Sequence, residues 1–266
     1  MTSSPHSKYA LVTGASSGIG WHLSVQLAQR GYSLIAVSNQ ITGLQELRKQ
    51  LESKYQVEVK IIDTDLSNTD TARYLFEYCK ENDLSVEVLV NNAGNLVLGE
   101  ATNLTTSDSQ SNMQLQMITP VLLCQIFGQE MIKNRIGFVL NVSSISAAMA
   151  LPLISLYGPT KGFLRQFSNA FRTEMKHHKV GVTCLIPGAT DTPLLETHKL
   201  NLPMAKSLGI ISKPEWVARK GINALFNNRK ECIPGILNKI ILLLVPIIPQ
   251  FLIRIIYKKL WLGPSR

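Results

Sequence analysis

The fold of this chain is decided by residues 9–20, which read Tyr-Ala-Leu-Val-Thr-Gly-Ala-Ser-Ser-Gly-Ile-Gly. The first five read as a strand, glycines follow at positions 14, 18 and 20, and a helical pattern begins at Ile19. Glycines let a backbone approach a pyrophosphate closely, and the helix N-terminus offers unpaired N–H groups and a positive dipole end. The stretch predicts a strand–turn–helix unit that binds a dinucleotide; a glycine-rich turn without a ligand is the alternative.

Apolar runs alternate with amphipathic segments along the rest of the chain. We expect strands at 9–13, 33–37, 57–62, 86–90, 137–142 and 181–186. We expect helices at 18–30, 44–55, 69–82, 113–132 and 160–176. This order predicts an α/β fold, a doubly wound parallel sheet of the Rossmann type with helices on both faces.

The positive charge is concentrated in the last quarter of the chain. Residues 1–198 hold 15 Lys/Arg and 16 Asp/Glu, whereas residues 199–266 hold 12 Lys/Arg and 2 Asp/Glu. We expect a catalytic domain at 1–235, which includes a substrate lid at about 190–215, and an apolar, basic C-terminal extension at 236–266. Nucleic-acid binding is not expected, because the basic residues bring no base-reading or stacking groups with them.

The four cysteines, Cys79, Cys124, Cys184 and Cys232, are far apart and form no CxxC or Cys/His pattern. We therefore expect reduced thiols and no metal site. Residues 1–9 are short and polar, which does not suit a secretory signal, so we expect a cytoplasmic protein.

A second group of residues points to proton transfer. Tyr157 and Lys161 are four residues apart, and Ser144 lies thirteen residues before the tyrosine, just after a predicted strand. On a helix, side chains at i and i+4 share one face. A lysine ammonium beside a phenol favours the phenolate, which would lower the tyrosine pKa towards working pH and suit it to acid–base catalysis. The alternative is a surface Tyr/Lys pair and a loop serine.

Several motifs in a fixed order carry a resemblance to a known family. They are Thr13–Gly20, Asp65-Leu66, Asn91-Asn92-Ala93-Gly94, Ser144, Tyr157–Lys161, and Pro187-Gly188 followed by Thr192. Over residues 8–195 the chain resembles a short-chain dehydrogenase/reductase. The resemblance implies a sheet of about seven strands, a nicotinamide cofactor, Tyr157 as acid/base, Lys161 on the nicotinamide ribose, and Ser144 orienting the substrate.

The same resemblance, together with the glycine loop, defines a set of expected cofactor contacts. Asp65 and Leu66 would flank the adenine, Asn91 would steady the sheet, and residues 187–192 would cover the carboxamide. The expected cofactor-binding residues are Gly14, Ser16, Ser17, Gly18, Ile19, Gly20, Ser38, Asn39, Asp65, Leu66, Asn92, Ala93, Gly94, Tyr157, Lys161, Pro187, Gly188, Thr190 and Thr192.

The choice between NADP(H) and NAD(H) depends on the end of the second strand. A carboxylate there usually bonds the ribose hydroxyls of NAD. This chain has Val37-Ser38-Asn39, with neither an acid nor an arginine. No acid repels a 2′-phosphate, so the sequence favours NADP(H), although Ser17, Ser38 and Asn39 could hydrogen-bond either form.

The chain departs from the family pattern at two places. The family usually has a helix asparagine roughly 41 residues before the tyrosine, and the backbone of that asparagine helps to anchor a water in the proton relay. This chain has Gln116 at that position, and Asn112 has the wrong spacing. We count Gln116 as a catalytic candidate and expect a slower relay. Gly158-Pro159 lies inside the Tyr–Lys motif, and the proline biases Gly158 away from helical angles, which makes the Tyr–Lys geometry less secure.

The substrate end is apolar. Residues 145–156 are mostly apolar, and residues 194–211 add leucines, isoleucines and a methionine, with His198 and Lys199 among them. An apolar pocket with few polar anchors favours a lipophilic ketone or alcohol; the alternative is that these residues pack a lid against the core.

Residues 240–253 form an apolar run that Pro246 and Pro249 interrupt, too short to span a bilayer. Lys239, Arg254, Lys258 and Lys259 flank the run, and Trp261 follows. Three interpretations stay open for residues 239–262: peripheral contact with an anionic membrane, contact with a second subunit of a homo-oligomer, or packing within the chain.

Taken together, the sequence predicts an NAD(P)-dependent oxidoreductase that interconverts a lipophilic ketone, acyl or steroid-like, and a secondary alcohol. The alternative from another class is a non-catalytic dinucleotide-binding protein, a redox sensor or membrane-associated scaffold, which Gln116 favours and the Ser144–Tyr157–Lys161 set disfavours. A nucleotide-sugar epimerase or dehydratase would need a longer C-terminal substrate domain.

Overall fold

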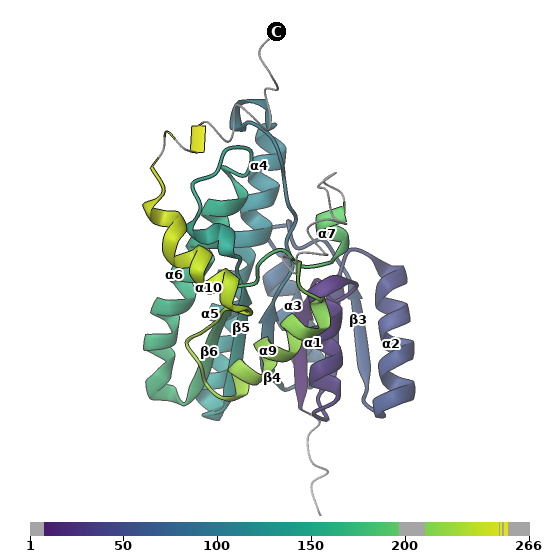
Figure 1. Ribbon diagram of the computed structural model, residues 1–266. Coiled ribbons are helices and arrows are strands. Elements are labelled where there is room, and N and C mark those ends of the chain that lie inside the picture. Colours follow the sequence, from purple (N-terminus) through teal and green to yellow (C-terminus); the bar gives the residue numbers. More distant parts are fainter. Residues whose placement is uncertain (1–7, 197–210, 250, 252, 255–266) are drawn as a thin grey trace, which may run out of the picture.

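The computed structural model describes residues 8–196, 211–249, 251, 253 and 254 (Figure 1). A seven-stranded parallel sheet in the order β3-β2-β1-β4-β5-β6-β7 forms the middle layer. The strands are β1 Tyr9–Thr13, β2 Ser33–Ser38, β3 Val59–Asp63, β4 Val86–Asn91, β5 Gly137–Val142, β6 Val180–Leu185 and β7 Glu231–Cys232. The strand order reverses direction beside β1, which confirms the predicted doubly wound fold.

Helices cover both faces of the sheet, as Figure 1 shows. The α-helices are α1 Gly18–Ala28, α2 Ile41–Tyr55, α3 Thr71–Glu81, α4 Thr106–Met113, α5 Thr119–Asn134, α6 Tyr157–Met175, α7 Pro193–Glu196, α9 Pro214–Phe226 and α10 Ile236–Leu244. Short 3-10 turns lie at Ala101–Asn103, Ile145–Ala148, Lys176–His178 and Val245–Ile247, and a π-helical turn at Gln114–Ile118.

The core is split into two apolar clusters by the sheet. One lies under α1, α2 and α9, and the other under α3, α5 and α6. Alternate residues of β1 serve the two clusters: Val12 packs into the first and Leu11 into the second, and both are fully buried. Strands β1, β2 and β6 read as mainly apolar runs because their side chains are covered on both faces of the sheet.

The six strands expected from apolar runs are confirmed: two have the expected ends, and the ends of the other four differ by at most two residues. The seventh, β7, is two residues long and carries no periodic signal, so only the family resemblance implied it. One helix prediction was wrong: 113–132 is not a single helix. It comprises the end of α4, the π-helical turn and most of α5, because Pro120 has no N–H to donate to the carbonyl of Gln116.

The expected substrate lid falls mainly on residues 197–210, which lie outside the described residues. The start of the C-terminal extension is described and packs on the catalytic domain. The side-chain amide of Asn238 in α10 is buried, donates to the carbonyl oxygen of Pro234 at 2.6 Å, and lies against Gly188. The division into domains at 235/236 stays a prediction.

In the parts of the chain that the structure describes, no helix has both the length and the apolar character needed to cross a membrane.

Candidate active site

A cleft of about 680 Å³ opens along the carboxyl ends of the central strands. Its walls come from the turn after β1, the ends of β2, β3 and β4, the serines after β5, the start of α6, and the loop after β6. In open parallel sheets ligands bind at this edge, beside the point where the strand order reverses. The cleft therefore brings together motifs that are up to 180 residues apart in the chain.

The turn after β1 is shaped by glycines that no other residue could replace without movement. Gly14 and Gly18 have φ of 65° and 55°, in the left-handed region that side chains rarely adopt. A Cβ on Gly20 would lie 2.0 Å from the carbonyl oxygen of Gly14. The backbone of Gly20 is thus in direct contact with the backbone of Gly14. The turn residues that line the cleft are Gly14, Ser16, Ser17, Gly18 and Ile19.

The N-terminus of α1 faces the cleft with its donors uncapped. Ser17, the capping residue, makes no side-chain hydrogen bond to the helix, and the first turn has no acidic residue. The first N–H groups of a helix lack partners within it and carry the positive end of its dipole. This end of α1 can accept an anionic group such as a pyrophosphate.

Hydrogen bonds clamp the glycine turn to the end of β4. The Thr13 hydroxyl accepts from the backbone N–H groups of Asn92 and Ala93 at 2.9 and 3.1 Å. The Asn92 amide in turn donates to the carbonyl oxygens of Thr13 and Gly14 at 3.0 and 3.2 Å. Residues 13–20 and 91–94, which are far apart in the sequence, are therefore joined by hydrogen bonds at the base of the cleft.

The end of β2 presents hydroxyl and amide groups. The hydroxyls of Ser16 and Ser38 are 2.8 Å apart, and Ser16 donates to the side-chain oxygen of Gln40 at 3.4 Å. The Asp65 carboxylate accepts from the N–H and hydroxyl of Ser67, both at 2.8 Å. Among the described lining residues the charged ones are Asp65 and Lys161.

Tyr157 is the first residue of α6, so the helix includes the whole Tyr–Lys motif. Pro159 occupies the first turn, where its missing N–H costs nothing, and Gly158 donates to the carbonyl of Ile154 at 2.9 Å. The expected weakness at Gly158-Pro159 is therefore absent. The Lys161 Nζ lies 5.7 Å from the centre of the Tyr157 ring, on the same face of the helix.

The predicted lowering of the tyrosine pKa by Lys161 was wrong for the protein alone. Burial raises the pKa of Tyr157, and a hydrogen bond with Ser144 offsets part of the rise. Burial lowers the pKa of Lys161 to about 8. Burial disfavours the charged form of both groups, the ammonium of Lys161 and the phenolate of Tyr157.

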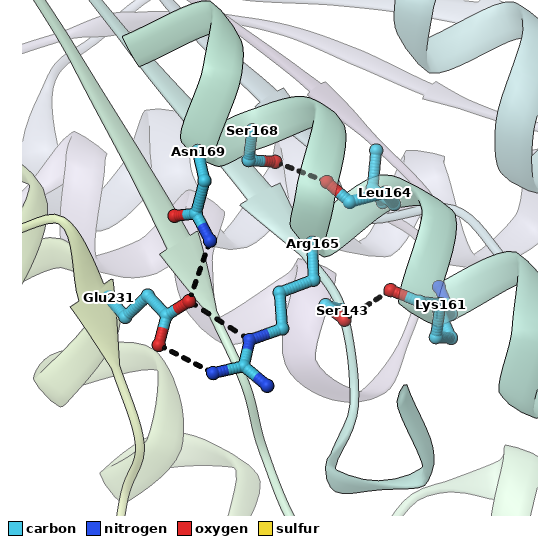
Figure 2. A network of polar contacts seen from close by, with 7 residues as sticks. All are labelled: Ser143, Lys161, Leu164, Arg165, Ser168, Asn169 and Glu231. Carbon is cyan, nitrogen blue, oxygen red and sulfur yellow. Dashed lines mark hydrogen bonds and ion pairs between the residues drawn. The ribbon is translucent and has the colours of Figure 1, made fainter. Parts of the chain in front are cut away.

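Lys161 is held at a fixed point in the cleft. Its side chain is buried, and its ammonium donates to the carbonyl oxygen of Val142 at 3.1 Å. The Ser143 hydroxyl donates to the carbonyl oxygen of Lys161 at 2.7 Å, which ties the helix backbone to the end of β5 (Figure 2). A lysine has three donors, so two N–H bonds remain for groups in the cleft.

Gln116 lies behind Gly94 and faces the same point as Lys161. A Cβ on Gly94 would be 2.9 Å from the Gln116 Oε1 and 3.2 Å from the Lys161 Nζ. The Gln116 amide nitrogen donates to the Asn112 side chain at 2.9 Å, while its Oε1 is buried and has no hydrogen-bond partner among the described residues. At the position where the family usually has an asparagine, this chain therefore has a glutamine whose side-chain oxygen is available to accept a hydrogen bond.

Below the cleft, α6 is anchored by polar contacts that Figure 2 shows. Arg165 donates two hydrogen bonds to the Glu231 carboxylate, at 2.9 and 3.0 Å, and Asn169 adds a third at 3.0 Å. Asn141 donates to Ser168 at 2.9 Å and accepts from Asn91 at 2.9 Å, which joins β4 and β5 to the helix. Asn91 thus steadies the sheet, as the resemblance implied.

All but two of the expected site residues line the cleft. The exceptions are Gly20, which packs under the turn, and Gln116, which lies one layer deeper. Sequence reasoning missed the lining residues Gln40, Thr64, Ser67, Asn95, Leu96, Ser111, Leu115, Val142, Ser143, Ala189 and Pro193. Most of these directly follow a strand or a recognised motif, and that position is the signal that could have found them.

The comparisons with known proteins agree with this architecture. The family model described as short chain dehydrogenase matches residues 8–202. The chain belongs to the short-chain dehydrogenase family.

Named relatives and solved structures are similar to the chain over most of its length. The very-long-chain 3-oxoacyl-CoA reductase of Kluyveromyces lactis is 28% identical over 82% of this chain and 63% of the relative. The 17-beta-hydroxysteroid dehydrogenase type 3 of Mus musculus is 30% identical over 75% of this chain and 65% of the relative. The chain thus spans less than two thirds of their length. A Sphingobium yanoikuyae short-chain dehydrogenase solved with NADPH superposes with a TM-score of 0.79, 22% identity and coverage of 86% and 88%, and so shares the fold.

Glu231→Gln tests the anchoring of α6. Burial raises the pKa of Glu231, but hydrogen bonds from Arg165 and Asn169 outweigh that effect and leave it lowered. Because its pKa is lowered in the folded state, the ionised Glu231 stabilises the fold at pH values above the ordinary glutamate pKa. This stabilisation is lost as the pH falls through the folded-state pKa. We expect the variant to lose about 1–2 kcal/mol of unfolding free energy at neutral pH.

Urea denaturation at several pH values measures this effect. The wild type and Glu231→Gln should converge in acid, below the ordinary glutamate pKa of 4.5. The exposed Glu46→Gln in α2 serves as the matched control and should change little at any pH. A loss for Glu231→Gln that does not depend on pH would contradict the ion-pair account.

Proposed function

We propose that the chain is a nicotinamide-dependent oxidoreductase that interconverts a lipophilic ketone and a secondary alcohol. The observation that carries the proposal is the meeting of Tyr157, Ser144 and buried Lys161 at one end of a cleft whose other end is the glycine turn. An acid–base pair beside a phosphate cradle suits hydride transfer to a carbonyl.

The residues fit the dinucleotide. The uncapped N-terminus of α1 would hold the pyrophosphate, the floor at 92–94 would hold the ribose side, and Lys161 would donate to a ribose hydroxyl with its spare N–H groups. A bound reduced nicotinamide supplies the hydride. Ser144 would orient the carbonyl oxygen, and Tyr157 would give that oxygen its proton as the alcohol forms, or take it back in the reverse direction.

A raised tyrosine pKa favours the direction in which Tyr157 donates. The phenol is then protonated at neutral pH and ready to act as an acid, whereas alcohol oxidation needs the phenolate. We therefore propose that reduction of the carbonyl is the direction that burial of the phenol favours.

The substrate class is proposed from the apolar residues and from the relatives' names. Leu96, Leu115 and Leu194 line the cleft, and the named relatives act on 3-oxoacyl-CoA and on hydroxysteroids. An acyl or steroid-like ketone suits such a wall. Cytoplasmic location and homo-oligomeric assembly stay predictions from the sequence.

Tyr157→Phe tests the reaction. Removing the hydroxyl takes away the proton donor, so kcat for ketone reduction should fall by about 10²–10⁴ while NADPH binding is kept. Turnover of a panel of 3-oxoacyl, steroid and cyclic ketones with NADPH measures this, and the exposed Tyr74→Phe in α3 is the matched control. Turnover that survives in Tyr157→Phe would contradict the assigned role; dinucleotide binding without turnover of any ketone would favour the redox-sensor alternative.

Asn39→Asp tests the cofactor preference. We propose that NADP(H) is favoured, because Ser38, Asn39 and Gln40 at the end of β2 bring no carboxylate against a 2′-phosphate. A carboxylate placed there should repel the phosphate and shift the NADPH/NADH ratio of kcat/KM towards NADH by about tenfold or more. Asn39→Gln is the neutral control, and an unchanged ratio in Asn39→Asp would contradict the proposal.

Gln116→Leu tests whether the unusual residue replaces the family asparagine through its side chain. We propose that its Oε1 accepts a hydrogen bond from Lys161 or from a bridging water, which favours the charged lysine. Without this acceptor the lysine pKa should fall further, so the alkaline limb of the kcat–pH profile should move to lower pH.

The matched control for Gln116→Leu is Gln114→Leu, because Gln114 lies in the same π-helical turn and donates to Thr119 at 3.1 Å, away from Lys161. The control should keep the wild-type pH profile. A uniform loss of kcat in Gln116→Leu with no movement of the profile would show a merely structural role.

A further inference from the structure

The outer face of α10 and the turn that follows it is apolar and exposed. Seven of the fourteen large exposed hydrophobic side chains among the described residues lie within residues 236–251: Ile236, Leu237, Ile240, Leu243, Leu244, Ile247 and Phe251. We call these seven residues the α10 face. Ile236 and Leu243 are 77% and 75% exposed, far more than a surface leucine normally is. Contiguous apolar surfaces of this kind mark interaction sites.

The helix α10 is anchored on the domain. The exposure of the α10 face is therefore not the result of a detached helix. Ile236, Ile240, Leu243 and Ile247 recur at the spacing of one helical stripe, which points to solvent. The buried amide of Asn238 lies on the opposite side and fixes the helix on Pro234 and Gly188. A helix anchored through a polar residue with its apolar stripe outward is built for a partner outside the domain.

The surroundings of the α10 face are positively charged. Lys239 within α10 and Arg254, three residues after Phe251 in the chain, are exposed. In the sequence, residues 236–266 hold five Lys/Arg and no Asp/Glu. An apolar helical face with basic neighbours and no acids matches the headgroup region of an anionic bilayer, where apolar side chains enter the acyl boundary and lysines meet lipid phosphates.

We propose that the α10 face is a docking site for the surface of an anionic lipid membrane. The nine residues of α10 span about 14 Å, which is half of a hydrocarbon core, so the helix would lie in the interface. A two-fold contact with a second copy would set the same basic residues against each other without acids to neutralise them. The charge pattern therefore favours lipid over self-association.

The docked surface would lie beside the substrate end of the molecule. Through Asn238, α10 contacts Gly188, which lines the active-site cleft. A second cavity of about 400 Å³ lies between the loop that precedes Tyr157, at Met149–Pro152, and Ile253 and Arg254 after the α10 face. A bilayer held against this side would be next to the apolar loop between Ser144 and Tyr157.

Vesicle co-sedimentation of the full chain tests the proposal without any substrate or turnover. We expect binding to phosphatidylcholine vesicles that contain phosphatidylserine, weaker binding to phosphatidylcholine alone, and loss of binding as salt rises. The double variant Ile240→Glu/Leu243→Glu should lose affinity by about tenfold or more. Lys239→Gln/Arg254→Gln should lose about fivefold per charge on anionic vesicles and little on neutral ones.

Tyr74→Glu in α3 is the matched control, because Tyr74 is 49% exposed and lies away from α10; it should bind as the wild type does. Circular dichroism and unfolding curves of each variant show that the fold is kept. Absence of vesicle binding by the wild type would overturn the proposal. So would a wild-type dimer in sedimentation velocity that Ile240→Glu/Leu243→Glu dissociates, because a second copy would then cover the face.

Discussion

The contact between Gly14 and Gly20 is the constraint on which the site depends. A Cβ on Gly20 would lie only 2.0 Å from the carbonyl oxygen of Gly14. The chain can therefore turn from β1 into α1 only if residue 20 has no side chain. Because the turn closes so tightly, the N-terminus of α1 is brought to the carboxyl edge of the sheet. Thr13 and Asn92 then lock this turn to β4, and the cleft floor becomes a single unit.

Burial is the main cause of the pKa shifts of Tyr157 and Lys161 at the other end of the cleft. Lys161 is buried on α6 with the Val142 carbonyl as its acceptor, and its pKa falls to about 8. The phenol of Tyr157 has its pKa raised by the same surroundings. Burial thus disfavours the charged forms of both groups, the ammonium of Lys161 and the phenolate of Tyr157. The ion pair of Arg165 with Glu231 keeps the helix that carries both residues in place.

Much of this architecture could be predicted from the sequence, and the exceptions have physical reasons. Strands β1, β2 and β6 are buried at every position and β4 and β5 at nearly every position, so each leaves a mainly apolar run. Strand β3 is partly exposed and is still mainly apolar, whereas β7 has two residues and leaves no such run. The glycine turn was readable because only glycine meets its backbone demands. The break near Gln116 leaves no signal in the hydrophobic pattern, because a helical period continues through a π turn. The missing N–H of Pro120, four residues after Gln116, is the sequence feature that marks it. The direction of the Tyr157 pKa was missed because spacing shows a neighbouring charge but does not show burial.

The cleft between the glycine turn and Lys161 is proposed to bind a nicotinamide dinucleotide. Fluorescence titration of the purified chain with NADPH and NADH is the first measurement to make, with Gly14→Val as the variant that disrupts the turn. We expect saturable binding to the wild type, NADPH more tightly than NADH, and loss of binding in Gly14→Val. If the folded wild type binds neither dinucleotide, the proposed cofactor site is wrong.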